Sequence, residues 1–168
     1  MKPTVQSNIH IKQEDTGLSV LQVLPSLETG GGGVERTTID IAEAIVNNHF
    51  KDKYKAYSAG SNPTGKINSD IKKFLEMKNY DLSKITSKNF DTFINNEIKM
   101  DHVITVCNNA NNEVCPIWPK RDQIIHWDIE DPVSKLINLN ENEKNNIILN
   151  TFNVINEKIK NWIKNEEQ

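Results

Sequence analysis

The chain has 168 residues, with 20 Lys and Arg against 23 Asp and Glu, and 36% of its residues are hydrophobic. This length and composition fit a single domain with one core. The net charge of −3 gives no overall basic field for nucleic acid, and no apolar run approaches the roughly 20 residues that cross a bilayer. We therefore expect a cytoplasmic, monomeric protein that binds neither nucleic acid nor a membrane.

The N-terminal part predicts a tail followed by a strand, a glycine loop and a helix. Residues 1–17 lack periodicity and indicate a disordered tail, so that residues 18–168 form the domain. Residues 18–24 are a nearly continuous apolar run that ends at Pro25, which is typical of a strand buried on both faces of a parallel sheet. After the glycines, helical spacing begins at Glu35. Its expected buried face carries Ile39, Ala42, Ile45 and Val46.

Three more strands are expected, at residues 54–58, 102–106 and 123–127. His126 and Trp127 end the last of these strands, and we interpret both as core residues. Residues 81–93 indicate a mixed segment with short helical turns.

Two further helices alternate with these strands. One runs from Asn68 to about Lys78, and the other is a long amphipathic helix that begins at Glu141. This alternation predicts an α/β fold with a four-stranded parallel sheet flanked by helices, whose ligands sit beyond the carboxyl ends of the strands. The expected buried residues of the two helices are Ile71, Phe74, Leu75 and Met77 in the first, and Ile148, Phe152, Ile155, Ile159, Trp162 and Ile163 in the second.

The glycine loop is a candidate oxyanion site. Gly30, Gly31, Gly32 and Gly33 stand between a strand and a helix, where backbone N–H groups and the helix dipole favour an anion. Arg36 could add two donors to the same anion. A plain connection remains the alternative, because the run matches neither the P-loop nor the dinucleotide fingerprint.

Two cysteines and one aspartate are candidates for chemistry. Cys107 ends a predicted strand and Cys115 follows eight positions later, so the two form either a redox pair or two small buried side chains. No export signal is evident, which favours reduced thiols. Asp131 precedes Pro132, which restricts it to an extended conformation and could aim its carboxyl group into the site as a general acid; a purely structural turn is the alternative. No histidine has partners at metal-ligand spacing, so we expect neither a metal nor a cofactor.

Four segments carry a specific resemblance: AEAIVNNHF, YKAYSAGSNPTGKIN, MDHVITVCNNANNEVCPIWP and IIHWDIEDP. From about Ala42 to its end the chain resembles the arsenate reductases that share the fold of low-molecular-weight protein tyrosine phosphatases. The resemblance implies reduction of arsenate by thiol chemistry, with phosphate as a related oxyanion and thioredoxin or a similar thiol donor as partner. It also implies that Asp131 is the general acid and that Cys107 and Cys115 are the two later redox thiols.

The nucleophile loop of that family is not matched. The family's C-x5-R motif supplies the attacking Cys and an Arg, but counting back without gaps from Ala42 places Gly32 and Thr38 at these positions. No cysteine precedes Cys107, so we expect reduced or absent turnover. Residues 20–46 are instead similar to the N-terminus of family 4 glycosyltransferases. The alternatives are a non-catalytic oxyanion-binding domain, or a fusion fragment with a glycosyltransferase N-terminus.

Overall fold

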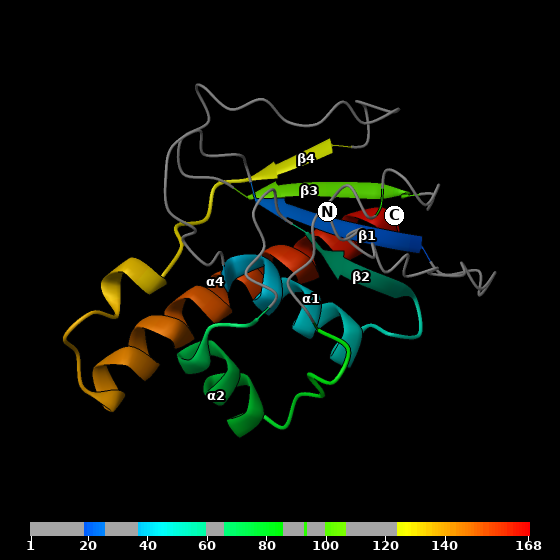
Figure 1. Ribbon diagram of the computed structural model, residues 1–168. Coiled ribbons are helices and arrows are strands. Elements are labelled where there is room, and N and C mark those ends of the chain that lie inside the picture. Colours follow the sequence, from blue (N-terminus) through cyan, green and yellow to red (C-terminus); the bar gives the residue numbers. More distant parts are fainter. Residues whose placement is uncertain (1–18, 26–36, 60–65, 86–92, 94–99, 107–123) are drawn as a thin grey trace, which may run out of the picture.

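Four strands form the sheet at the centre of the molecule (Figure 1). The computed structural model describes residues 19–25, 37–59, 66–85, 93, 100–106 and 124–168. The strand order is β2-β1-β3-β4, and every neighbouring pair is parallel. The strands are β1 (Ser19–Pro25), β2 (Tyr54–Ser58), β3 (His102–Val106) and β4 (Ile124–Trp127).

The register brings three strands to a common carboxyl edge. Pro25 of β1 is paired with Val106 of β3, and Val106 is paired with Trp127 of β4. In open parallel sheets ligands bind just beyond this edge, where the chain leaves the strands. The loop after β4 therefore begins at the edge where a site is expected.

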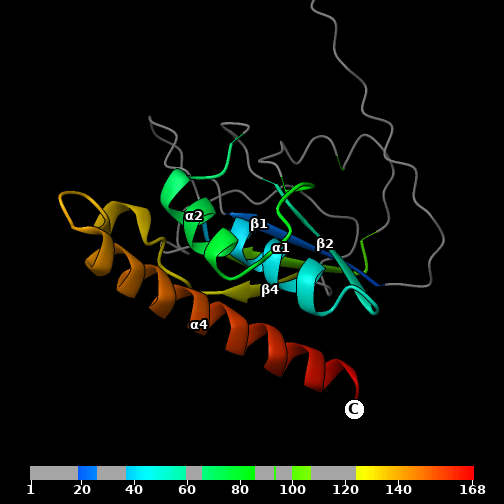
Figure 2. The same ribbon diagram turned by 90° about the horizontal axis from the view of Figure 1, so that it is seen from below.

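Three helices and one short helical turn are described. They are α1 (Thr37–His49), α2 (Ser69–Met77), the 3₁₀ turn η2 (Val133–Lys135) and α4 (Glu141–Glu166). Figures 1 and 2 show α1, α2 and α4 together on one face of the sheet. The side chains of these helices and of that sheet face form one core cluster, which includes Tyr54, Ala56, Ile104 and Trp127.

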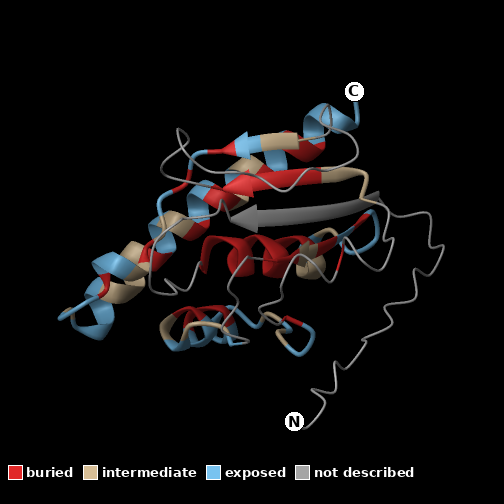
Figure 3. Cartoon of the chain, turned by 45° about the horizontal axis from the view of Figure 1, so that its top comes forward, coloured by how far each residue is buried: buried red, intermediate tan, exposed pale blue. Residues whose placement is uncertain are grey.

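Helix α1 is buried along most of its length, and it is the red helix at the centre of Figure 3. All ten residues from Thr37 to Val46 are buried, not only the single apolar face that the sequence indicated. The cause is its position, because α1 contacts β1 and β2 as well as α2 and α4. Polar side chains of α1 consequently need partners inside the protein.

The long helix α4 covers the sheet as its periodicity predicted. All six side chains expected in the core are buried: Ile148, Phe152, Ile155, Ile159, Trp162 and Ile163. Two other expectations are wrong. Met77 is 63% exposed because α2 ends there, beyond its buried residues Ile71, Phe74 and Leu75. His126 is exposed while Trp127 is buried, because successive residues of a strand face opposite sides of the sheet.

A second, smaller cluster covers the other face of the sheet. Val103 points away from the main core, and it packs with Ala59 and Phe93 against the half-buried Tyr57 and Ile124. On the same face, Thr105 and the Nδ1 atom of His126 are joined by a 2.9 Å hydrogen bond between β3 and β4.

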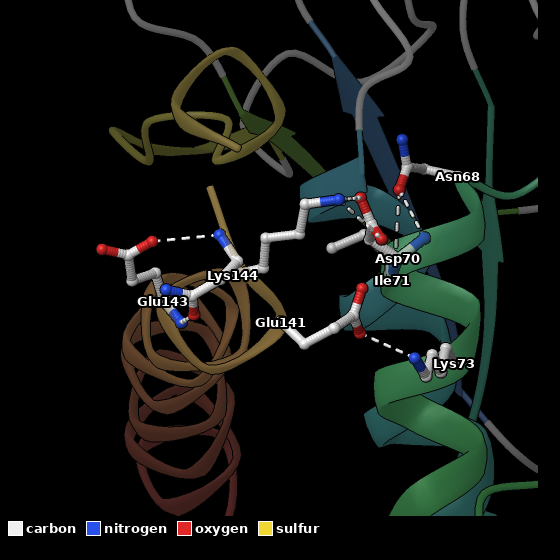
Figure 4. A network of polar contacts seen from close by, with 8 residues as sticks. Asn68, Asp70, Ile71, Lys73, Glu141, Glu143 and Lys144 are labelled. Atoms are coloured by element: carbon white, nitrogen blue, oxygen red, sulfur yellow. Dashed lines mark hydrogen bonds and ion pairs between the residues drawn. The ribbon is translucent and has the colours of Figure 1, made fainter. Parts of the chain in front are cut away.

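Polar contacts connect the beginnings of α2 and α4 (Figure 4). The side chain of Asn68 caps α2, and Lys144 of α4 lies 3.2 Å from the carboxylate of Asp70 in the first turn of α2. Lys73 and Glu141 are 2.6 Å apart, and this hydrogen bond lowers the pKa of the Glu141 carboxyl and raises that of Lys73. These contacts are exposed or half-exposed, so they orient the two helices more than they stabilise them.

Neighbouring positions on α4 provide a matched test of this packing. Ile155 is fully buried, whereas Val154 is 47% exposed. We expect Ile155→Ala to lower the free energy of unfolding by about 2–5 kcal/mol, because it leaves a cavity in the core. Val154→Ala should change it by no more than about 0.5 kcal/mol. Denaturant unfolding followed by circular dichroism measures both, and equal effects would contradict the assignment of the buried face.

Candidate functional site

The described residues include one of the side chains that the sequence predicted for the site. Asp131 lies in the loop between β4 and η2. The other predicted site residues lie outside the described residues: Gly30, Gly31, Gly32, Gly33, Arg36, Cys107 and Cys115.

The carboxylate of Asp131 is bound to the first residue of α1. Its Oδ2 atom accepts a hydrogen bond from the backbone N–H of Thr37 at 2.8 Å, and its Oδ1 atom accepts one from the Thr37 hydroxyl at 3.3 Å. The two residues are 94 positions apart in the sequence. Asp131 is half-buried, and Thr37 is fully buried. The loop after β4 is therefore fixed to the N-terminus of α1.

Local sequence explains why the carboxylate points this way. The Oδ1 atom of Asp131 also accepts a 2.9 Å hydrogen bond from the backbone N–H of Val133, which makes an Asx turn ahead of η2. Pro132 precedes the first residue of η2 and is buried, as is Ile129 on the other side of Asp131. Buried residues on both sides and the turn together hold the carboxyl group in one orientation.

The electrostatics of this end of α1 favour an anion. The first N–H groups of a helix have no partner within the helix, and the aligned peptide dipoles place a partial positive charge there. The Asp131 carboxylate supplies the acceptor and the negative charge. The contact thus puts the carboxyl group of Asp131 at hydrogen-bonding distance from the start of α1.

A second polar group, which our sequence analysis missed, lies in the next turn of α1. Asp40 and Glu43 are buried, and the hydroxyl of Ser58 at the end of β2 lies within hydrogen-bonding distance of both carboxyl groups, 3.4 Å from that of Asp40. The sequence did hold a signal for Glu43. It is four positions after Ile39, so it falls on the apolar face of the predicted helix.

A cavity beside the loop that carries Asp131 does not suit an anion. It has a volume of about 310 Å³ between the loop after β4 and α4, and its lining includes the carboxylates of Asp128 and Glu130. The one lysine in that lining, Lys135, is paired with Glu130 at 2.5 Å. Asp131 itself does not line this cavity, since its carboxyl group is bound to α1.

A larger cavity lies at the opposite end of α1. It measures about 560 Å³, and His49 in the last turn of α1 is part of its lining together with Lys78, Tyr80, Phe152 and Lys160. Burial raises the pKa of Tyr80, whose hydroxyl lies 2.6 Å from His49. The lining of this cavity includes none of the residues that the sequence predicted for the site.

The described part of the chain holds neither a metal-binding cluster nor a helix that could span a membrane. No group of three or more His, Cys, Asp or Glu side chains is arranged there to hold a metal ion. Among the described helices, none combines the length and the apolar character that a membrane span requires.

The fold defines the class of protein. A solved structure titled "An arsenate reductase in the phosphate binding state" superposes with a TM-score of 0.66 at 18% identity, covering 88% of this chain and 98% of that one. The low molecular weight protein tyrosine phosphatase from T. tengcongensis superposes with a TM-score of 0.53 at 15% identity, covering 85% and 99%. The chain thus has the α/β fold of low-molecular-weight phosphatases, as predicted.

The sequence gives the family. The family model described as "Low molecular weight phosphotyrosine protein phosphatase" matches residues 33–167, and the chain belongs to this family. It is 35% identical to arsenate reductase 2 of Bacillus cereus over 95 residues, which are 56% of this chain and 68% of that protein. An arsenate reductase of Bacillus anthracis matches with the same identity and coverage. The match to arsenate reductases is thus as the sequence predicted, whereas the similarity of residues 20–46 to glycosyltransferases stays a prediction.

The buried hydroxyl of Ser58 provides a test of the polar group in α1. We expect Ser58→Ala to lower the free energy of unfolding by about 1–3 kcal/mol, because it removes a hydrogen-bond donor from two buried carboxyl groups. Ser69→Ala, at an exposed position in α2, is the control and should have an effect of at most about 0.5 kcal/mol. A Ser58→Ala protein as stable as the control would show that other partners satisfy both carboxyl groups.

Proposed function

We propose that this protein is an arsenate reductase-like protein that binds arsenate or phosphate at the N-terminus of α1. The observation that supports this proposal is the contact between Asp131 and Thr37, because Asp131 is the predicted general acid and this helix end favours an anion. The family match begins at residue 33, so the segment just before α1 belongs to the matched part of the chain.

The relatives support arsenate as the oxyanion. The curated relatives at 35% identity are named arsenate reductases, and one structural neighbour is a thioredoxin-dependent arsenate reductase from Corynebacterium glutamicum, with a TM-score of 0.56 at 20% identity. Another structural neighbour is an arsenate reductase in the phosphate-binding state. Arsenate and phosphate share a tetrahedral shape and charge, so one anion position accepts both.

Cys107 and Cys115 are the proposed redox thiols. Reduction of arsenate to arsenite takes two electrons, and two thiols that join as a disulfide release two electrons and two protons. Thioredoxin or a similar dithiol would then return the pair to the reduced form by exchange. This assignment rests on the resemblance of the segment around both cysteines, MDHVITVCNNANNEVCPIWP.

The first covalent step lacks its nucleophile. With Ala42 as the anchor, Gly32 stands at the family's cysteine position, and both cysteines of the chain come later in the sequence. Glycine has no side-chain atom that could attack arsenic or phosphorus. We therefore propose that oxyanion binding is kept and turnover is weak or lost, which makes a non-catalytic oxyanion-binding domain the second candidate.

Binding and turnover measured on one preparation test this proposal. We expect arsenate and phosphate to bind in isothermal titration calorimetry, with little arsenate reduction in the presence of thioredoxin and little hydrolysis of an aryl phosphate. Strong reduction that disappears in Cys107→Ser would contradict the loss of turnover and show that a later thiol attacks the oxyanion. Absence of arsenate and phosphate binding would contradict the proposed function itself.

Mild oxidation tests the two thiols separately. We expect a disulfide between Cys107 and Cys115 within one chain, seen by mass spectrometry after digestion and removed by thioredoxin. Closing the loop requires the two Cα atoms to approach within roughly 7 Å. The Cys115→Ser variant is the control and should leave Cys107 open to alkylation after the same treatment. Two thiols that stay reduced and resist alkylation in the folded protein would instead mark them as buried structural residues.

A further inference from the structure

We propose that the cavity at the carboxyl end of α1 binds a small aromatic carboxylate, at a site separate from the proposed oxyanion position. The lining comes from three stretches of chain: the end of α1, the residues that follow α2, and the middle of α4. These three helices contact one another, so they hold the walls of the cavity in place. The cavity lies at the opposite end of α1 from Thr37, which allows the two sites to be tested independently.

The cavity has the size and the aromatic wall that a ring-shaped ligand needs. Its volume of about 560 Å³ falls within the range of roughly 300–1,000 Å³ that is usual for small-molecule sites. Tyr80 and Phe152 line it with ring centroids 6.0 Å apart, and the half-buried ring of Phe50 adds to the same lining. A planar aromatic ligand can therefore stack or pack edge-on against these side chains.

The charged side chains of the lining are positive. Lys78 and Lys160 reach the cavity from two different elements, and the described lining includes no aspartate or glutamate. The Nζ atom of Lys78 lies 4.7 Å from the centre of the Phe152 ring, and no carboxylate in the described part of the chain pairs with it. The ammonium group of Lys78 is thus held over an aromatic face with its hydrogen-bond donors available to an anion.

Helix α4 brings the second lysine and an amide to the cavity. Phe152, Asn156 and Lys160 are spaced four residues apart, so they form a row along one side of the helix. Lys160 is 3.3 Å from Glu157, but both side chains are more than half exposed. An exposed ion pair of this kind is weak, so Lys160 can turn from Glu157 to a carboxylate in the cavity.

Helix ends provide another explanation for basic side chains here. Lys78 directly follows α2, where a positive charge offsets the partial negative charge of the helix end. That partial charge is only roughly half an elementary charge. Carbonyl groups of the last turn also have backbone partners, since the Tyr80 N–H donates to the Leu75 carbonyl at 3.1 Å. The end of α2 therefore leaves part of the charge of Lys78 for a ligand.

Two naphthalene compounds test the site. 2-Naphthoate carries the carboxylate, and 2-naphthol has the same ring system but is uncharged at neutral pH. We expect 2-naphthoate to bind about tenfold more tightly in calorimetry, because only its carboxylate gains charge-assisted hydrogen bonds from lysine. In ¹⁵N-resolved NMR the amide signals of Tyr80 and Asn156 should move, and saturating inorganic phosphate should leave the affinity for 2-naphthoate unchanged.

Three lysine variants test which charges hold the carboxylate. We expect Lys78→Gln and Lys160→Gln each to weaken binding of 2-naphthoate by about fivefold, because each loses one charged donor. Lys164→Gln is the matched control, since Lys164 is exposed one turn further along α4 and does not belong to the lining. Its affinity should stay within about twofold of the unaltered protein. All three lysines are exposed, and circular dichroism checks that the variants fold.

The outcomes separate this inference from the proposed function. No binding of 2-naphthoate, or equal binding of 2-naphthol, would overturn it. Unchanged affinity in both Lys78→Gln and Lys160→Gln would also overturn it, because these lysines would then serve only the helix end and the surface. Displacement of 2-naphthoate by phosphate, with the Thr37 signal moving instead, would place the probe at the oxyanion position and contradict a separate site. Binding of 2-naphthoate with the expected lysine dependence, in a protein that binds no phosphate, would uphold this inference and overturn the proposed function.

Discussion

The contact between the carboxylate of Asp131 and Thr37 holds the loop after β4 against the start of helix α1. It connects the loop after the edge strand β4 to the first residue of the central helix α1, across 94 positions of sequence. Buried N–H groups at a helix start need an acceptor, and here the acceptor is a side chain from a distant loop. The same contact thus fixes the position of the loop and puts a carboxyl group at the positive end of the helix dipole.

Helix α1 serves both the core and the candidate site. Its residues from Thr37 to Val46 are buried between the sheet and the other two helices. The apolar side chains among them belong to the main core, while Asp40 and Glu43 share the hydroxyl of Ser58 at the end of β2. A change near the helix start would therefore affect both stability and the proposed anion binding, and matched control variants are needed to separate the two.

Much of this arrangement could be predicted from the sequence. The three-and-four spacing of apolar residues identified the buried face of α4 completely, because a long helix on one face of a sheet has a single apolar stripe. The same logic failed for α1, because a helix covered by other elements is buried all round and its polar residues then face partners that no local pattern reveals. Asp131 was found from the Asp-Pro turn and from the resemblance. Its partner Thr37 was not, because the contact depends on the sheet order, which brings β4 beside β3 and β3 beside β1.

Family membership and chemistry differ in what they imply for this chain. The chain belongs to the low molecular weight phosphotyrosine protein phosphatase family, and an ungapped count back from Ala42 puts Gly32 where we expect the attacking thiol. Binding of the oxyanion and its reduction are therefore tested separately. A crystal structure with arsenate or phosphate bound addresses the binding question most directly. The account predicts the anion at the N-terminus of α1, beside the loop that carries Asp131. An anion bound away from this helix end would contradict it.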